Sequence, residues 1–397
     1  MSDKKNSAEK GLGTTVVRSG RKTEEYFGFV NPPVYHGSTV LYRDVATLKS
    51  RKVRYTYGRR GNPTAEALED ALTELDGGAG TVLTSSGLAA IALAFMSVVR
   101  ANGHVLVADN VYHPTRHFCD TVLKPLGIET TYFDPLLASD GLKALIRDNT
   151  QAIFFESPGS QTFEMLDVPA VTAIANDADI PAIMDNTWAT PLFFRPLEHG
   201  ADIAVYAGTK YTGGHSDIML GTVTANAKLW KDLHNTWGSM GLASSPDDIY
   251  LGQRGLRTMH VRLDRHMASA LEIARWLGTR PEVSRVLHPG LESHPGHAIW
   301  KRDFTGSSGL FSLVMQPGPD EAVAAFLDHL AYFGLGYSWG GYESLAIPFD
   351  CSSYRTATKF EAEGPAIRLH IGLEDVADLK ADLEAGLERW RNAGGGV

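Results

Sequence analysis

Short apolar runs alternate with helical patterns between residues 63 and 257, and this alternation predicts the main fold. Apolar stretches of helical length separate several of the runs, as at residues 88–99 and 168–178. Continuous apolar strands separated by helices favour a mostly parallel sheet with helices on both faces. The expected strands are residues 81–86, 104–109, 130–134, 152–157, 181–186 and 202–207.

The pattern changes on either side of this region and divides the chain into three expected parts. Residues 1–62 show little periodicity and include the basic aromatic run RKVRYTYGRRG, which predicts an extended N-terminal arm. Residues 63–257 are expected to form the main α/β domain. Residues 258–397 are expected to form a smaller C-terminal α/β domain, with an amphipathic helix at 376–392 and a frayed tail, AGGGV.

The composition is that of an ordinary globular protein and excludes several classes of function. Hydrophobic residues make up 43% and charged residues 21%, and the formal net charge is -9. This acidic balance offers no basic face to nucleic acid or anionic lipid, and no stretch approaches the length of an apolar membrane span. With no apolar leader and only Cys119 and Cys351 as cysteines, the chain is expected in the reducing cytoplasm.

Two polar residues that follow predicted strands are candidates for cofactor chemistry. Asp185 ends the strand at 181–186, and Lys210 follows the strand at 202–207 within the glycine-rich loop AGTKYTGGHSD. Ligands of parallel sheets bind at the carboxyl ends of the strands, so both residues lie where a site is expected. Alone, each has an ordinary explanation, as a helix cap or a solvated surface residue. Together they match an amine that attaches a cofactor and a carboxylate that pairs with its ring nitrogen.

Further candidates would bind anions or stack on a planar ring. Ser85–Leu88 lies where a strand turns into a helix, so free backbone amides favour an anion there, although a plain helix cap is commoner. Arg59 could fork onto phosphate oxygens or belong to a solvated basic face. Tyr112 could stack on a planar ligand or pack in the core. Arg368 could bind a substrate carboxylate with two N–H groups, or it could have only a structural role on its strand.

Motifs for metals, dinucleotides and serine nucleophiles fail on inspection. His113, His117 and Cys119 lie close in sequence, but neither HEXXH nor CXXC occurs, so no zinc site is expected. The segment GLGTTV precedes every predicted strand, and GSSG lacks the GxSxG pattern. The cofactor chemistry around Lys210 therefore has no rival motif.

Several long motifs together resemble the Cys/Met-metabolism family of pyridoxal-phosphate enzymes. The most specific is DIAVYAGTKYTGGHSD around Lys210, and the others are YGRRGNPT, ESPGS, MDNTWATP, LGQRGLRT, KRDFTGSSGLFS, YSWGGYESL and IRLHIGLEDVADLKADLEAG. The resemblance extends from about residue 30 to about residue 390. It implies the type I fold of aspartate aminotransferase, with residues 63–257 as the cofactor-binding domain.

The resemblance implies a set of residues that hold pyridoxal 5'-phosphate. Lys210 would attach the cofactor covalently, Asp185 would pair with its ring nitrogen, and Tyr112 would stack on its ring. Its phosphate would be bound by the amides of Gly87 and Leu88, by Thr209, and by Tyr57 and Arg59 of the neighbouring subunit. The family often has Ser or Ala two residues before the lysine. Here Gly208 stands in that place, which removes one possible phosphate hydroxyl.

The same resemblance implies the substrate and the reaction. Arg368 would bind the α-carboxylate of a small amino acid, Ser338 and Trp339 would line the same pocket with Tyr112, and Lys210 and Tyr112 would act in catalysis. The motif YSWGGYES favours the branch that cleaves L-cystathionine by β-elimination to homocysteine, pyruvate and ammonia, a carbon–sulfur lyase of methionine biosynthesis. The alternatives are γ-elimination or γ-replacement in the same family, and a non-catalytic regulatory protein that binds pyridoxal phosphate. A homo-oligomer is also implied, with active sites shared within dimers that pair into a homotetramer.

Overall fold

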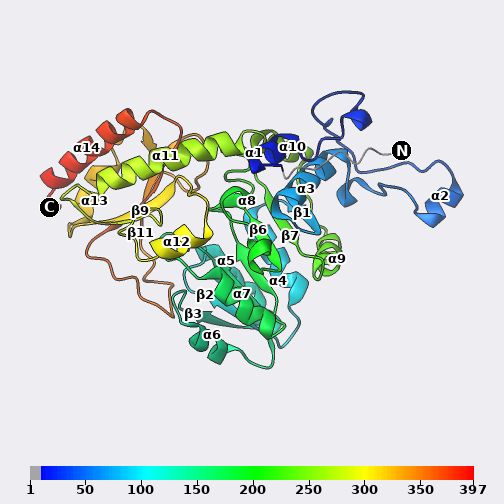
Figure 1. The fold of residues 1–397 in the computed structure, drawn as a ribbon, viewed down its shortest axis with the longest axis horizontal. Helices are drawn as coiled ribbons and strands as arrows, with labels where there is room; N and C mark the ends of the chain where they lie inside the picture. The colour runs from blue at the N-terminus through cyan, green and yellow to red at the C-terminus, as the bar shows by residue number, and fades with distance from the viewer. Residues whose placement is uncertain (1–9) are drawn as a thin grey trace.

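Two β-sheets organise the chain in the computed structural model, which describes residues 10–397 (Figure 1). The larger sheet has seven strands in the order β1-β7-β6-β5-β4-β2-β3. Only β7 runs antiparallel to its neighbours, so the sheet is mostly parallel, as expected. The strands are β1 (Gly80–Thr84), β2 (His104–Ala108), β3 (Glu129–Phe133), β4 (Thr150–Glu156), β5 (Ala182–Asp185), β6 (Ile203–Tyr206) and β7 (Gly221–Ala225).

Helix α3 (Pro63–Asp76) begins and ends where the sequence provides caps. Asn62 accepts hydrogen bonds from the N–H groups of Thr64 and Ala65, Pro63 opens the first turn, and Gly77 ends the helix with φ of 70°. Apolar side chains of the helices around this sheet join those of the strands in one buried core. The helices are α3 (Pro63–Asp76), α4 (Gly87–Val98), α5 (His113–Phe118), α6 (Ser139–Leu145), α7 (Val168–Asp177), α8 (Thr190–Phe193), α9 (Trp230–Met240) and α10 (Pro246–Leu256).

The smaller sheet has five strands in the order β10-β11-β12-β9-β8 and a second core of its own. Its strands are β8 (Val283–Leu287), β9 (Leu310–Met315), β10 (Phe333–Gly334), β11 (Ser344–Phe349) and β12 (Ala366–His370). The accompanying helices are α11 (Met259–Leu277), α12 (His297–Asp303), α13 (Asp320–Leu327) and α14 (Val376–Asn392). The last helix has the bounds that its periodicity predicts. Across residues 10–397, no helix combines the length and apolar character needed to cross a membrane.

Strand β7 was not predicted, because its segment GTVTA carries too many polar residues to suggest burial. Its threonines are nevertheless buried, and the hydroxyl of Thr224 has hydrogen-bond partners across the sheet and on α3. Thr224 Oγ1 pairs with Thr81 Oγ1 at 2.9 Å and donates to Asp76 Oδ2 at 2.7 Å. Hydrogen-bonded hydroxyls can be buried at little cost, and an apolarity pattern does not detect them.

The N-terminal arm has a packed base and an extended remainder. Helix α1 (Leu12–Arg18) packs on α3 and buries Val16, so the first described residues are more ordered than the sequence suggests. Beyond Tyr26 the chain loops back to α3, where the N–H of Tyr35 donates to Thr64 Oγ1 at 2.9 Å, and then extends away from the body with α2 (Val45–Ser50) at its tip (Figure 1).

The expectation of a frayed C-terminal tail is wrong. Gly396 N–H donates to Pro317 O at 2.9 Å, and the buried Trp390 donates from Nε1 to Gly396 O at 3.0 Å. The run of glycines allows this fold-back, because a side chain at Gly395 would collide with the Trp390 ring.

Candidate active site

The carboxyl edge of the larger sheet gathers residues that the sequence singled out. Strand β1 leads to Gly87, β2 to Tyr112, β5 to Asp185 and β6 to Lys210. Gly87 shows how closely these segments approach, because a Cβ atom on it would lie 2.6 Å from the Cβ atom of Ala207. The N-terminus of α4 therefore lies against the end of β6, beside the loop that carries Lys210.

Lys210 is largely buried at this edge, and the segment before β11 holds its amine. Its Nζ atom donates a hydrogen bond to Ser338 Oγ at 2.6 Å and lies 5.3 Å from the centre of the Trp339 ring. Burial, together with the charge of Arg368, lowers the pKa of Lys210 to about 8, and the opposing charge of Asp185 limits the shift. Near neutral pH, such an amine is a far better nucleophile and base than an ordinary lysine.

Asp185 presents a carboxylate that its neighbours hold in one orientation. Its Oδ1 atom accepts hydrogen bonds from the backbone N–H and the hydroxyl of Thr187, at 2.9 and 2.5 Å. The Thr187 hydroxyl in turn accepts from the N–H of Ala207 at 2.8 Å. Burial raises the pKa of Asp185, although Thr187 and Lys210 oppose the shift. The bonds to Oδ1 leave Oδ2 for a cationic partner, which would favour the charged carboxylate.

Tyr112 stands at the start of α5 with 48% of its surface exposed, so its ring is accessible to a ligand. Glu156 ends β4 beside Asp185 in the sheet and accepts the N–H of Tyr112 at 2.7 Å and the hydroxyl of Ser160 at 2.8 Å. Burial raises the pKa of Glu156, and the neighbouring Asp185 adds to the shift. Sequence reasoning gave Glu156 no role, although it ends its strand in the same way as Asp185.

The start of α4 offers backbone N–H groups to an anion. Gly87 and Leu88 are the first residues of a 12-residue helix, and the first amides of a helix have no partner within it. Ser86 caps the helix by accepting a bond from the N–H of Ala89 at 3.2 Å. The amides of Gly87 and Leu88 thus remain available to a phosphate.

Thr209 and Gly208 both pack against Leu220. The Thr209 hydroxyl donates to Leu220 O at 3.1 Å and accepts from Leu220 N–H at 3.0 Å. Its predicted contact with phosphate therefore stays a prediction that requires the hydroxyl to turn. A Cβ atom at Gly208 would lie 2.9 Å from the Leu220 side chain, which accounts for glycine at this position.

Arg368 reaches the same cluster from the smaller sheet. Its Nη2 atom donates to the carbonyl oxygen of Ser338 at 3.1 Å, and burial lowers the pKa of Arg368 to about 10, which leaves it a cation at neutral pH. Ser338 has φ of 83°, a conformation that residues other than glycine rarely adopt. This one residue accepts from Lys210 through its hydroxyl and from Arg368 through its carbonyl. The other N–H donors of Arg368 could fork onto a carboxylate.

Tyr57 and Arg59 lie apart from this cluster. Arg59 Nη1 donates to the carbonyl oxygen of Gly238 on α9 at 3.0 Å, and Tyr57 is 47% exposed. Among the described residues, no hydrogen bond joins either residue to Lys210 or to the start of α4. The expectation that they serve the neighbouring subunit's site stays a prediction.

The residues at this edge fit pyridoxal phosphate group by group. They offer an amine for its aldehyde, a carboxylate for its ring nitrogen, an aromatic ring for its face and a helix N-terminus for its phosphate. On this fold, the combination defines a pyridoxal-phosphate enzyme of type I. More particularly, the chain belongs to the Cys/Met metabolism PLP-dependent enzyme family, whose model matches residues 13–388.

Individual relatives are similar over nearly their whole length. Cystathionine beta-lyase MetC of Escherichia coli K12 is 43% identical, across 96% of this chain and 99% of that protein. Cystathionine beta-lyase of Salmonella typhimurium LT2 is 44% identical, with the same coverage. The crystal structure of cystathionine gamma synthase from Xanthomonas oryzae pv. oryzae in complex with cystathionine has a TM-score of 0.90 at 32% identity, covering 97% of this chain and 100% of that one. The predicted family, fold class and cofactor are confirmed.

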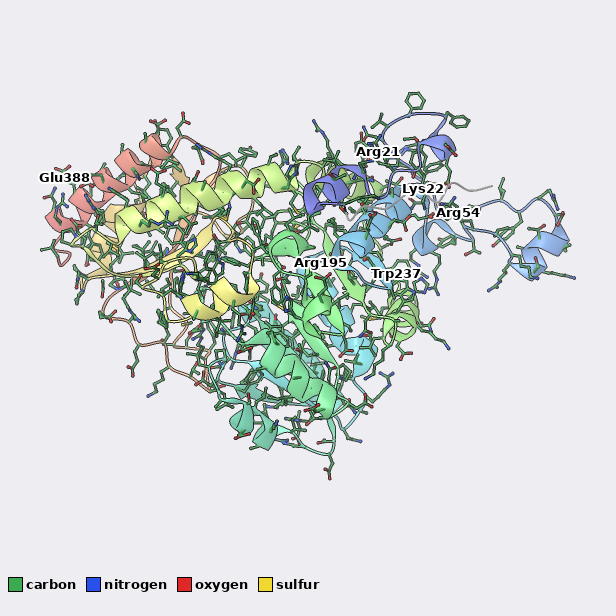
Figure 2. The ribbon with its side chains drawn as sticks, viewed as in Figure 1. Arg21, Lys22, Arg54, Arg195, Trp237 and Glu388 are labelled. Atoms are coloured by element: carbon green, nitrogen blue, oxygen red, sulfur yellow. The ribbon has the colours of Figure 1, made fainter. Side chains whose placement is uncertain are left out.

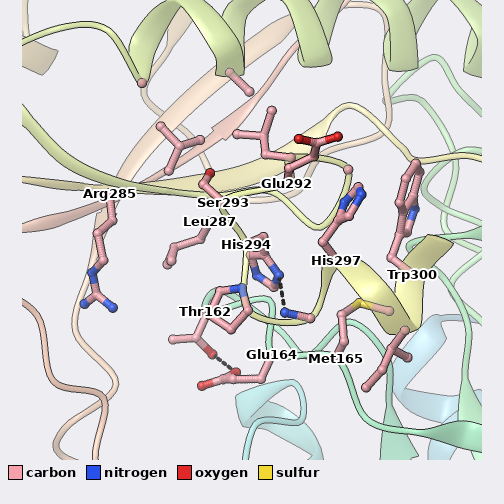
Figure 3. A pocket seen from close by; sticks show the side chains of 18 of the residues that line it. Thr162, Glu164, Met165, Arg285, Leu287, Glu292, Ser293, His294, His297 and Trp300 are labelled. Carbon is pink, nitrogen blue, oxygen red and sulfur yellow. Dashed lines mark hydrogen bonds between the residues drawn. The ribbon is translucent and has the colours of Figure 1, made fainter.

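A large cavity lies elsewhere and shares no lining residue with this site. It has a volume of about 1310 Å³ and lies among α11, β8, α12 and the segment that carries Glu164. Figure 3 shows His294, His297 and Trp300 around it, with His294 Nδ1 accepting a bond from the N–H of Gly296 at 3.0 Å. Cavity size alone therefore does not point to the cluster of candidate residues, which lies where the strand ends meet.

Proposed function

We propose that this protein cleaves L-cystathionine by β-elimination, as a carbon–sulfur lyase of methionine biosynthesis. The observation that carries the proposal is that Ser338 joins a base, Lys210, to a carboxylate clamp, Arg368. A base and a carboxylate clamp that share one hydrogen-bond partner suit an α-amino acid, because its acidic Cα–H bond is next to its carboxylate. The similarity to cystathionine β-lyases supports cystathionine as the substrate.

The chain's own residues bind the substrate and move its protons. Arg368 binds the α-carboxylate and so aims the Cα–H bond, and Lys210 Nζ takes the proton from Cα. Bound pyridoxal phosphate supplies a ring that draws off the negative charge left on Cα. Asp185 would pair with the ring nitrogen and keep it protonated. The amides of Gly87 and Leu88 would hold the phosphate, joined by Thr209 when its hydroxyl turns from Leu220.

The β-carbon–sulfur bond breaks next, and sulfur leaves with the bonding electrons. Lys210 Nζ, which has gained the Cα proton, gives a proton to the sulfur, and homocysteine departs. Burial raises the pKa of Tyr112, with Glu156 and Asp185 adding to the shift, so its hydroxyl stays protonated and can assist. Hydrolysis of the remaining three-carbon fragment then gives pyruvate and ammonia. Trp339 lines the pocket beside the Lys210 amine.

The active site is completed by a second subunit in this proposal. The arm exposes a series of apolar side chains, and Phe27 and Leu41 are 95% and 90% exposed. Apolar area of this kind is stabilised when it is covered by another surface, which a second copy would supply reciprocally. Tyr57 and Arg59 would then bind the partner's phosphate, and dimers would pair into a homotetramer. The chain would divide into the arm (1–62), the cofactor-binding domain (63–257) and the C-terminal domain (258–397). The proposed location of the protein is the cytoplasm.

One assay separates this function from its rivals. The purified holoenzyme is incubated with L-cystathionine, and the keto acid and thiol are identified by mass spectrometry. Pyruvate with homocysteine is the expected result. 2-Oxobutyrate with cysteine would favour γ-elimination, and no keto acid at all would favour a non-catalytic binder.

A further inference from the structure

We propose that His370 is a positioning residue that holds residues 338–340 in place and so aims Lys210 and Arg368 at the substrate. The inference deepens the proposed function, because the two aimed groups are those that would act on an amino acid. His370 lies two residues after Arg368 on β12, so both side chains project from the same face of the smaller sheet.

Two side chains of β12 bind the segment at two residues that have the same spacing as the side chains themselves. Arg368 donates to the carbonyl oxygen of Ser338 at 3.1 Å, and His370 Nε2 accepts the N–H of Gly340 at 3.0 Å. The two anchors are two residues apart on the strand and two residues apart on the segment. The segment is therefore tied to the sheet edge much as a neighbouring strand would be, but through side chains.

The second ring nitrogen of His370 holds the far end of the same turn. Nδ1 lies 3.0 Å from the carbonyl oxygen of Glu343, which can only accept, so Nδ1 carries the proton. The two bonds together require the neutral ring, because Nε2 can accept only when it carries no proton. Burial lowers the pKa of His370 well below its usual value, and His266, Arg368 and Lys210 add to the shift, so the ring keeps this form.

The segment that His370 holds is strained and lies directly on Lys210. Ser338 and Gly340 have φ values of 83° and 86°. A Cβ atom at Gly340 would lie 3.0 Å from the carbonyl carbon of Lys210 and 3.1 Å from its Cα. A strained residue keeps its conformation only when its surroundings impose it. If the Gly340 anchor is lost, Ser338 can relax, and its bonds to Lys210 and Arg368 loosen together.

The chain supplies a matched control in His266. Its ring is buried, its centre lies 5.3 Å from the centre of the His370 ring, and it also contacts Tyr211. The ring nitrogen Nδ1 is hydrogen-bonded to Ile371 O at 2.7 Å and not to the segment. Among the described residues, no hydrogen bond joins His266 to residues 338–340, so its replacement disturbs the same core without removing an anchor of the segment. A general packing effect and a positioning effect can thus be told apart.

The test compares His370→Asn, His370→Gln and His266→Asn in the holoenzyme. The Asn amide at position 370 can replace the Nδ1 donor but not the Nε2 acceptor, whereas the longer Gln side chain can place its oxygen near the Nε2 position. Readouts are the Kd for glycine from the cofactor's absorbance change, KM and kcat for L-cystathionine, and the thermal midpoint. His370→Asn should raise the Kd and KM about 10- to 100-fold, the size expected when a charge-assisted hydrogen bond such as that of Arg368 to the carboxylate is lost. His370→Gln should stay within about threefold of the wild type.

Three results would overturn the proposal. One is a lowered thermal midpoint in His370→Asn with wild-type Kd and KM, and another is an equal rise of the Kd in His266→Asn. If His370→Asn does not fold, His370→Gln decides, and a Kd raised more than tenfold would count against the proposal. Should the wild type bind glycine but cleave no cystathionine, the proposed function fails, while the glycine comparison still decides the role of His370.

Discussion

The carboxyl edge of the larger sheet and the N-terminal arm contain residues predicted for the same active site, yet they are built in opposite ways. At the edge, Lys210 and Asp185 are held by hydrogen bonds to Ser338 and Thr187, and all four are at least partly buried. In the arm, apolar side chains such as Phe27 face solvent, and the segment projects from the body (Figure 1).

The base of the arm explains why it leaves the body where it does. Lys22 and Arg54 lie close together there (Figure 2), and both pair with Glu66 of α3, at 2.5 and 2.6 Å. One chain thus fixes the predicted site residues of the edge by its own packing. The arm is bound to the body near both of its ends, at Glu66 and Thr64 of α3 and at Gly238 of α9, and its proposed function depends on a second surface.

The largest expected effect is that of Lys210→Ala, which removes the only group proposed for both cofactor attachment and proton transfer. Activity should fall to background. Borohydride reduction of the wild type should place the pyridoxyl label on the peptide that contains Lys210, as mass spectrometry of a digest would show. A label on another lysine would contradict the assignment of Lys210 as the residue that attaches the cofactor.

Asp185→Asn should retain the cofactor but lose activity by about 10²–10³-fold, because a neutral amide cannot hold the proton on the ring nitrogen. The measurement is kcat/KM for L-cystathionine at saturating cofactor. Asp179→Asn is the control, since Asp179 precedes the same strand at its opposite end and pairs with Lys228 at the surface. Wild-type kinetics in Asp185→Asn would contradict the assignment.

The lowered pKa of Lys210 predicts how the apoenzyme takes up pyridoxal phosphate at different pH values. Only the neutral amine attacks the aldehyde, so below pH 8 the rate should fall about tenfold per pH unit, and above pH 8 it should level off. Stopped-flow absorbance from pH 6 to 10 measures this. A rate that keeps rising to pH 10 would mean that burial does not perturb the amine.

The smallest expected effect is that of Arg54→Ala at the root of the arm. Arg54 pairs with Glu25 and Glu66 at the surface, and exposed pairs contribute at most about 1 kcal/mol each. The thermal midpoint should fall by a few degrees, and kcat/KM should stay at the wild-type value. A large loss of activity would show that the position of the arm depends on this network.

The positions of Lys210 and Asp185 at strand ends were predictable from the sequence, and their roles stay predictions. Lys210 and Asp185 follow strands that the apolar pattern locates, and a long motif surrounds Lys210. Glu156 and His370 were missed because they act by accepting backbone N–H groups of Tyr112 and Gly340. Such partners come close only in the folded chain, and no spacing in the sequence indicates which backbone N–H will lie within hydrogen-bond distance of a given side chain.

In our proposal, a complete active site needs residues from both regions and from two subunits. Arg59→Ala alone should lose a charge-assisted phosphate contact of about 1.5–3 kcal/mol, whereas a purely structural bond to Gly238 would affect stability instead. Lys210→Ala is inactive for a separate reason. In a mixed dimer of the two variants, one site carries both lesions and the other carries neither.

Mixing the two variants under conditions of subunit exchange tests this claim most directly. Half of randomly formed dimers are mixed, and each has one intact site of two, so activity should recover to about a quarter of the wild type. Arg54→Ala mixed with Lys210→Ala provides the control for an arm residue outside the site. Activity that stays at the average of the two separate variants, with exchange verified by mass spectrometry, would contradict the shared site.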